Sequence, residues 1–215
     1  MSDQIPFLPY IISAFIGIGL AAATGFRVFM PMFAVSLASY LGWIPMNESF
    51  EWLAGLPTLI TTGIAMIAEI LAYYIPFIDH LLDTISVPLA TIAGSVMFAS
   101  QFADIGTFPQ WALALIAGGG TAAAISSGFA GTRAASTATT GGLGNSVVAT
   151  TETAGAGIMS FLALAAPVIA FIAAVALIIT VLVLGKKLWR KFRNFNSDRD
   201  AKIINVDAVD RKNLE

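Results

Sequence analysis

Long apolar stretches alternate with short polar ones over most of the chain. Six apolar segments stand out, at residues 8–24, 28–43, 53–76, 85–103, 109–127 and 157–185. A straight helix needs about 20 residues to cross the hydrocarbon core of a bilayer. The third and last segments reach that length easily, whereas the first two are shorter and are separated by only "GFR". We therefore expect either one broken helix or a tight hairpin at this point.

Three polar stretches between the apolar segments predict interfacial loops. "WIPMNESFEW" begins and ends with Trp, which commonly anchors helices at the membrane surface. "YYIPFIDHLLDTISVP" at residues 73–88 predicts a second interface, with a short amphipathic turn that carries Asp79 and Asp83. "FADIGTFPQW" near Asp104 predicts a third.

The tract "TRAASTATTGGLGNSVVATTETAG", residues 132–155, is rich in Thr, Ser, Gly and Ala. Its glycines favour a turn or a helix break, and so does "SSGFAGTR" just before it. Irregular backbone at membrane depth is tolerated only inside protein or beside water. We expect a short helix between two breaks in residues 126–145. The alternatives are an extramembrane loop and a stretch of small residues for close helix packing. The expected helix breaks are Gly25, Gly128 and Gly131.

Two stretches of the sequence resemble each other. Residues 14–30, "AFIGIGLAAATGFRVFM", and residues 115–133, "LIAGGGTAAAISSGFAGTR", each contain an Ala triplet, a Gly-Phe pair and then an Arg. Transporters are often built from two related halves. The similarity indicates either an internal duplication or the general likeness of Ala- and Gly-rich membrane helices.

The composition places the chain in the membrane. Of its 215 residues, 57% are hydrophobic and only 11% are charged, against about 25% charged in a typical soluble domain. So many apolar runs cannot be buried in so small a soluble core. We predict an all-α, polytopic transmembrane bundle of about five to seven membrane segments. It would contain broken or re-entrant elements and a candidate two-fold repeat.

The basic residues gather at the C-terminal end. Nine of the 11 Lys and Arg follow Gly185, beginning with "KKLWRKFR". Because Lys and Arg favour cytoplasmic flanks, we expect a multi-pass inner-membrane protein with a cytoplasmic C-terminus. We divide the chain into a transmembrane domain, residues 1–185, and a basic, then polar tail, residues 186–215. Membrane lipids are the expected partners of this basic cluster, and nucleic acid is not, because no folded module accompanies the charge.

Several classes of chemistry are disfavoured. Without any cysteine, the chain has no disulfide and no cysteine-based metal or redox site. It contains no nucleophile elbow, metalloprotease helix or Walker loop. A metal site would use the spacing of Asp79, His80 and Asp83. However, such a group near an interface more often forms a solvated turn. We expect no enzyme activity, no metal and no cofactor.

Isolated charges within the apolar segments are the candidate functional residues. Arg27 and Arg133 are the only cations before Gly185, and a charge inside the membrane is costly unless it is paired. Glu69 lies within an otherwise apolar helix, where it could relay protons, bind a cation or form a structural pair with an Arg. The guanidiniums could instead recognise an anion or a lipid headgroup. Their candidate partners are Glu69, Asp79, Asp83, Asp104 and Glu152.

Three stretches together resemble a bacterial family of small multispanning membrane proteins, domain-of-unknown-function family 4126. They are "GFRVFMP", "AEILAYYIPFIDHLLDTI" and "RAASTATTGGLGNSVVATTE". The resemblance implies a polytopic inner-membrane protein, but it does not indicate any particular activity. It implies a shared pattern at Gly25, Phe26, Arg27, Glu69, Pro76, Asp79, Asp83, Arg133, Thr140, Gly141, Gly142, Asn145 and Glu152.

These features favour a small transporter or channel-like protein for a small ion or polar solute. The expected pathway or binding residues are Arg27, Glu69, Arg133, Thr139, Thr140, Gly141, Gly142, Asn145 and Glu152. We expect a homodimer, because so small a chain often needs a second copy to enclose a path. A lipid-handling protein or flippase that holds a phosphate headgroup, and a non-transporting assembly factor, are the alternatives.

Overall fold

The computed structural model describes residues 7–102, 105–187 and 190. Every regular element in this part of the chain is helical. The elements are α1 (Leu8–Phe26), α2 (Phe29–Tyr40), η1 (Glu48–Ala54), α3 (Leu56–Ala72), α4 (Pro76–Ala99), α5 (Thr107–Leu113), η2 (Ala114–Gly119), α6 (Gly120–Thr140) and α7 (Asn145–Ala165), followed by a helix at Pro167–Lys187.

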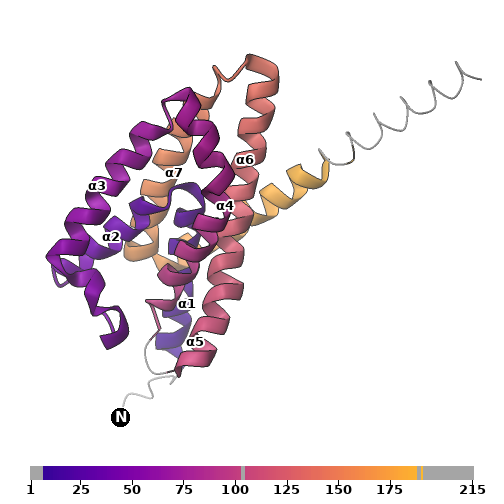
Figure 1. Ribbon diagram of the computed structural model, residues 1–215. Helices are drawn as coiled ribbons and strands as arrows, with labels where there is room; N and C mark the ends of the chain where they lie inside the picture. The colour runs from indigo at the N-terminus through magenta and orange to yellow at the C-terminus, as the bar shows by residue number, and fades with distance from the viewer. Residues whose placement is uncertain (1–6, 103–104, 188–189, 191–215) are drawn as a thin grey trace, which may run out of the picture. The chain divides into compact units, whose positions relative to one another are not determined.

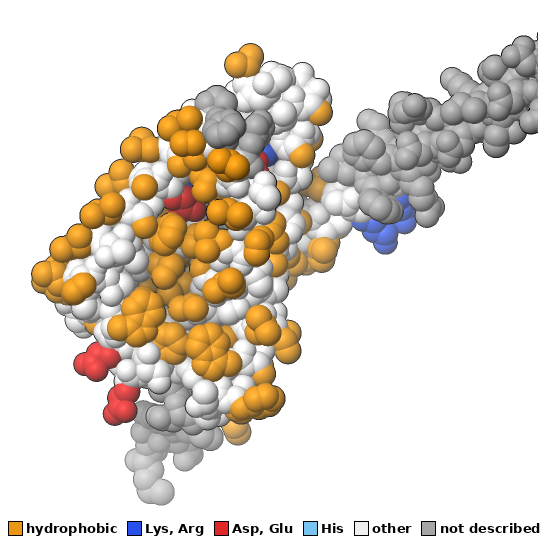
Figure 2. Space-filling view, in the orientation of Figure 1, with side chains coloured by type: hydrophobic (Ala, Val, Ile, Leu, Met, Phe, Trp, Pro, Cys, Tyr) orange, Lys and Arg blue, Asp and Glu red, His pale blue; other side chains and the backbone are white. Residues whose placement is uncertain are grey.

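The described helices are those of a multi-pass membrane protein. Five of them are long and apolar enough to cross a bilayer, and six if the bent pair η1 and α3 forms one span. Large apolar side chains also cover much of the outer surface (Figure 2), as they do on a protein whose solvent is lipid. The predicted all-α bundle is confirmed. The broken element is the 62° bend between η1 and α3.

Helix α1 is the central element of the bundle and packs against α4, α6 and α7 (Figure 1). Its C-terminal half is buried and consists largely of small residues, including Ala21, Ala22 and Ala23. Small side chains let membrane helices approach closely, which increases van der Waals contact where no hydrophobic force drives association. The alanine triplet therefore serves packing around α1.

The chain breaks between α1 and α2, as the short "GFR" separation predicts. Arg27 follows the last residue of α1 with φ −144° and ψ 130°, an extended conformation. Helix α2 begins two residues later and packs against α3 and α7. Within this break the backbone turns at the level of the charged cluster described below.

The predicted turn around Asp79 is helical instead. Helix α4 begins at Pro76, which suits the first turn because its missing N–H would have no partner there. The helix then continues through Pro88 to Ala99. Both aspartates consequently lie in the first turns of a long helix that reaches into the bundle.

The hydroxyl-rich tract contradicts the prediction of a short helix between two breaks. Residues 107–140 form one helical rod, and Gly128 and Gly131 lie inside α6, so the expected breaks at these glycines are wrong. The hydroxyl groups bond to the carbonyls of their own helix, as Thr132 does to Gly128 and Thr139 to Ala135, each at 2.9 Å. Thr and Ser can thus sit in an apolar helix without an external partner.

The one break in this tract is the turn between α6 and α7. Gly141 and Gly142 have φ values of 62° and 91°, which L side chains rarely adopt. The rod of 34 residues is about 51 Å long at 1.5 Å per residue. This exceeds a hydrocarbon core of about 30 Å. The turn therefore fits the extramembrane alternative better than a buried element.

The last predicted segment, residues 157–185, is two helices rather than one. Helix α7 ends at Ala165, and the next helix starts at Pro167. Proline has no backbone N–H to continue the hydrogen-bond ladder of the preceding turn, which explains the division.

The chain divides into two compact units, Met1–Ile178 and Ile179–Glu215, and the site described below lies in the first. The predicted tail from residue 191 onward and the predicted interface at Asp104 fall outside the described residues. The internal duplication stays a prediction. One Gly-Phe pair, Gly25 and Phe26, ends α1, whereas Gly128 and Phe129 lie within α6.

Candidate functional site

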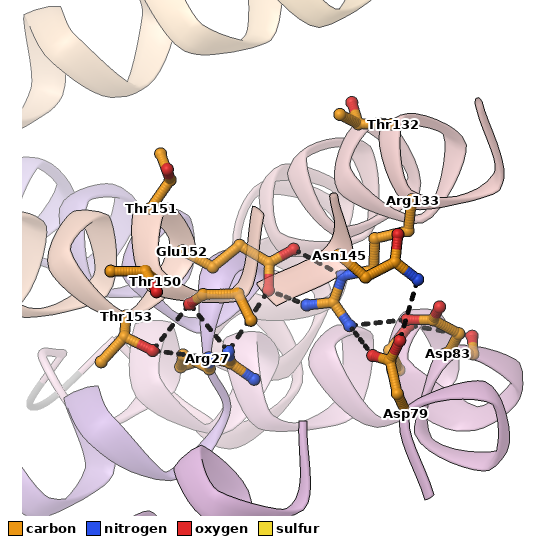
Figure 3. Close-up of polar contacts among 12 residues, drawn as sticks. Arg27, Asp79, Asp83, Thr132, Arg133, Asn145, Thr150, Thr151, Glu152 and Thr153 are labelled. Carbon is orange, nitrogen blue, oxygen red and sulfur yellow. Dashed lines mark hydrogen bonds and ion pairs between the residues drawn. The ribbon is translucent and has the colours of Figure 1, made fainter. Parts of the chain in front are cut away.

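Arg133 of α6 is the centre of a buried cluster of charged side chains. Its Nη1 donates to Asp79 at 2.9 Å and to Asp83 at 2.8 Å. Its Nε donates to Glu152 at 3.1 Å, and its Nη2 contacts the other oxygen of the same carboxylate. The Arg133 side chain is only 3% exposed. The fork of a guanidinium fits such paired contacts, and a buried cation is stable only when it is paired in this way (Figure 3).

Arg27 enters the same cluster from the break after α1. Its Nη2 donates to the carbonyl of Ala149 at 3.0 Å and lies 3.6 Å from Glu152, and its Nε donates to Thr153 at 3.3 Å. Glu152 therefore lies between Arg27 and Arg133 (Figure 3). Among the described residues, Nη1 of Arg27 has no partner.

Tyr73, one residue after α3, is stacked with both cations. The guanidinium carbons of Arg27 and Arg133 each lie over its ring, 3.9 Å from the centroid. Two guanidiniums cannot share the space over one face, so the ring lies between them. The electron-rich faces of an aromatic ring attract cations. Tyr73 therefore separates two like charges and attracts both.

Glu69 of α3 binds backbone rather than an arginine. Its two carboxylate oxygens accept hydrogen bonds from the N–H groups of Val28 and Phe29, at 2.9 and 3.0 Å. These groups open α2, where the first N–H groups have no intrahelical partner and the helix dipole favours negative charge. Glu69 therefore caps a neighbouring helix across the chain break. Glu69 forms no ion pair with either arginine among the described residues, and its role as a proton or cation site stays a prediction.

A cavity of about 300 Å³ adjoins this cluster. It lies among α3, α4, α6 and the break between α1 and α2, and its ionisable lining includes Glu69, Tyr73, Asp83, Arg133 and Glu152. Most of the remaining lining is apolar. Figure 2 shows acidic side chains in a hollow of the hydrophobic surface. The cavity thus brings ionisable groups to an otherwise apolar part of the bundle.

A second cavity of about 510 Å³ lies among α2, α3 and α7. Its walls are almost entirely apolar, and exposed Trp43 and Phe161 belong to them, so it opens on the outer surface. Ser160 lines it with a buried hydroxyl that has no partner among the described residues.

Five predicted site residues come together in the structure: Arg27, Glu69, Arg133, Asn145 and Glu152. Asn145 begins α7 and donates to Asp79 at 3.0 Å, which joins it to the cluster. Gly25, in the last turn of α1, lines the cavity.

The other predicted pathway residues lie outside the cavity lining. Thr139 and Thr140 end α6 and are exposed, and Gly141 and Gly142 form the turn that follows. Their hydroxyls and irregular backbone therefore contribute to the connection between α6 and α7, and not to the charged cluster.

Sequence reasoning missed the function of Tyr73 and the aromatic walls of the cavity, Phe26, Phe29 and Phe129. A signal for Tyr73 exists, because it follows Glu69 by four residues and so shares one helix face with it. The i,i+4 spacing of Asp79 and Asp83 was read as a solvated turn or a metal site. Both were also candidate partners of the arginines, and both carboxylates do accept from the same nitrogen of Arg133. Phe26 belongs to the pattern that the family resemblance implies, but nothing in the sequence places these three phenylalanines at a cavity rather than in the core.

Comparison with known proteins gives the family of the chain. A family model described as a domain of unknown function, DUF4126, matches residues 14–187. No curated protein and no solved structure matches the chain. The matched region contains the cluster from Arg27 to Glu152 and every helix that could span the membrane except the start of α1. The chain is thus a multi-pass membrane protein that belongs to the DUF4126 family.

Proposed function

We propose that this protein is a small transporter or channel-like protein for a small ion or polar solute, and that the cavity beside Glu69 holds the solute in transit. One observation carries the proposal. The cavity of about 300 Å³ reaches Glu69, Asp83 and Arg133 inside an apolar helical bundle. Ionisable groups in such surroundings are costly, and in membrane proteins they commonly mark ion or substrate paths.

The sign of the charge favours a cation or a proton over an anion. Among the described residues, the cluster and cavity combine two guanidiniums with four carboxylates, those of Glu69, Asp79, Asp83 and Glu152. Each donating nitrogen of Arg133 already faces a carboxylate. An anion would therefore meet acidic oxygens rather than donors at this wall.

Flux into liposomes tests the proposal. Purified protein is reconstituted, and the uptake of protons, sodium and potassium is measured with pH- and ion-sensitive dyes. We expect flux above that of empty liposomes, and a large loss with Glu69→Gln and with Arg133→Ala. Glu51→Gln, at an exposed position of η1, is the matched control and keeps the flux. Thermal unfolding of each variant separates loss of transport from loss of folding.

Flux that persists unchanged in folded Glu69→Gln and Arg133→Ala proteins would rule out the cavity as the path. If no flux is found and a stable protein partner is recovered on pulldown, the assembly-factor alternative replaces the proposal.

Lipid handling is the second candidate function, and the second cavity supports it. Its apolar walls and its opening beside Trp43 and Phe161 suit an acyl chain. The engaged donors of Arg133 count against a phosphate headgroup at the charged cluster. Mass spectrometry of lipid that co-purifies with the protein, compared with Gly157→Leu protein to narrow this cavity, decides between the two functions.

A further inference from the structure

We infer that the cavity beside Glu69 binds a small organic cation with an apolar body, held through the Glu69 carboxylate. This inference rests on the proposed function and names its substrate class. Three properties of the cavity lead to it: its size, the state of its carboxylates and the nature of its walls.

The cavity is too large and too apolar for a bare ion alone. Its volume is about 300 Å³, whereas one water in the liquid takes about 30 Å³. Pockets for small organic ligands begin at about 300 Å³. A metal ion with few waters would leave most of the apolar wall facing an empty or poorly solvated space. An occupant that fills the cavity needs an apolar body.

Glu69 is the carboxylate that can receive the charged head. Asp79, Asp83 and Glu152 each form an ion pair with Arg133, whereas Glu69 forms none among the described residues. Its oxygens accept two backbone N–H groups, and each oxygen has capacity for a further contact. The helix dipole of α2 offsets only part of a full negative charge. A cationic ligand would complete the compensation.

Aromatic rings provide the rest of the environment. Phe26, Phe29 and Phe129 line the cavity, and the rings of Phe26 and Phe129 lie 4.9 Å apart between centroids. Aromatic faces attract quaternary and protonated amines while they also bury apolar groups. A carboxylate beside phenylalanine rings therefore selects an alkylammonium or arylammonium ion over a hydrated metal ion.

A pair of isosteric probes tests the inference. Benzyltrimethylammonium carries the charge, and neopentylbenzene replaces its nitrogen with carbon and is neutral. Binding of both to purified protein in nanodiscs is measured by isothermal titration calorimetry, with tetramethylammonium and sodium as probes that lack an apolar body. We expect benzyltrimethylammonium to bind about tenfold or more tightly than each of the other three.

Two variants distinguish the contribution of the Glu69 charge to binding from that of the cavity volume. Glu69→Gln keeps one acceptor for the start of α2 and removes the charge, and it should weaken benzyltrimethylammonium binding by about tenfold or more. Ala65→Phe leaves every ionisable group in place and fills part of the cavity that Ala65 lines, so it should abolish binding even if Glu69→Gln fails to fold. Glu51→Gln is the matched control with unchanged binding.

The outcomes distinguish this inference from the proposed function. Equal binding of the charged and neutral probes, or unchanged binding in folded Ala65→Phe protein, overturns the inference. Proton or sodium flux without benzyltrimethylammonium binding overturns it too but leaves transport standing. Charge-dependent binding without any flux supports the ligand class and removes the proposal of transport.

Discussion

At the residue scale, the cluster shows how a membrane protein accommodates charges that would be costly alone. Arg133 is shared by three carboxylates, and Glu152 is shared by two arginines. Tyr73 adds a ring between the two guanidiniums. Because Glu152 contacts both guanidiniums, the loss of this one side chain removes compensation from two buried cations at once.

Replacement of Glu152 by leucine should therefore destabilise the protein strongly. Glu152→Leu removes the carboxylate that contacts both guanidiniums, and we expect a loss of about 3–5 kcal/mol, as for other broken buried ion pairs. The measurement is unfolding of purified protein in detergent, followed by circular dichroism. Thr151→Ala, at the neighbouring exposed position, should change stability by less than about 0.5 kcal/mol. Equal stabilities of the two variants would show that the ion pairs contribute nothing net.

The isolated charges and their candidate partners could be identified from the sequence, but which carboxylate pairs with which arginine could not. A single Arg or Glu within an apolar run can be recognised directly in the sequence. That Arg133 meets Asp79, 54 residues away, depends on how α4 packs against α6. The function of Glu69 was less accessible still, because its partners are backbone N–H groups of residues 28 and 29, which every residue except proline carries.

At the element scale, the sequence predicted the long spans and the break after α1, but it placed the breaks around Gly128 and Gly131 wrongly. Long apolar runs predict α1, α4 and α6 because the bilayer sets their length. The predicted breaks at Gly128 and Gly131 were wrong because a glycine lowers helix propensity by only about 1 kcal/mol, which packing and satisfied hydroxyls overcome. Gly141 ends α6 because its φ of 62° suits a residue without a Cβ.

Glycines in the rod of residues 107–140 should respond to substitution according to their neighbours. A Cβ on Gly118 would lie 2.5 Å from the Phe98 Cβ and 2.6 Å from the Gly94 carbonyl oxygen, whereas one on Gly120 meets no atom within 4 Å. We expect Gly118→Ala to destabilise the protein by about 1–3 kcal/mol through overpacking. Gly120→Ala should stabilise it by about 0.5–1 kcal/mol. Thermal unfolding of both variants measures the difference, and the reverse order would contradict the close contact between α4 and η2.

At the scale of the whole molecule, the cluster lies toward the end of the bundle where α1 and α3 end and α4 and α7 begin. Arg133 precedes the end of α6 by seven residues, or about 10 Å at 1.5 Å per residue. The charged wall of the cavity is therefore nearer to one end of the helical bundle than to the other. This position favours entry of water and solute from that side.

Thiol labelling should report both access and charge preference, because the natural chain has no cysteine to interfere. In Ser86→Cys the thiol replaces a hydroxyl that lines the cavity. We expect a trimethylammonium methanethiosulfonate reagent to label it several times faster than the sulfonate reagent, because the neighbouring carboxylates attract cations. Ser146→Cys, at an exposed position of α7, should show a smaller preference. Faster labelling of the cavity thiol by the anionic reagent would reverse the proposed selectivity.

The orientation of the protein in an inner membrane stays a prediction, and reporter fusions can test it. We propose that the C-terminus is cytoplasmic, since Lys186 and Lys187 end the last apolar helix and Arg190 follows it. Green fluorescent protein fused to the C-terminus should fluoresce in a bacterial host, and alkaline phosphatase fused there should be inactive. Active phosphatase with a dark fluorescent protein would place this end on the opposite side.

Helix α2 starts at the Glu69 carboxylate and, further along, lines the second cavity through Met30, Phe33 and Leu37. Helix α2 therefore contributes to the walls of both cavities, and Glu69 holds its first residues in place at the first cavity. A ligand that draws Glu69 away from the N–H groups of Val28 and Phe29 would free the start of α2. Movement of α2 would then change the shape of the second cavity. Thermodynamic linkage makes this coupling reciprocal. A lipid chain bound in the second cavity would change the affinity of the first cavity for its ligand, and that ligand would change the affinity for the lipid by the same factor.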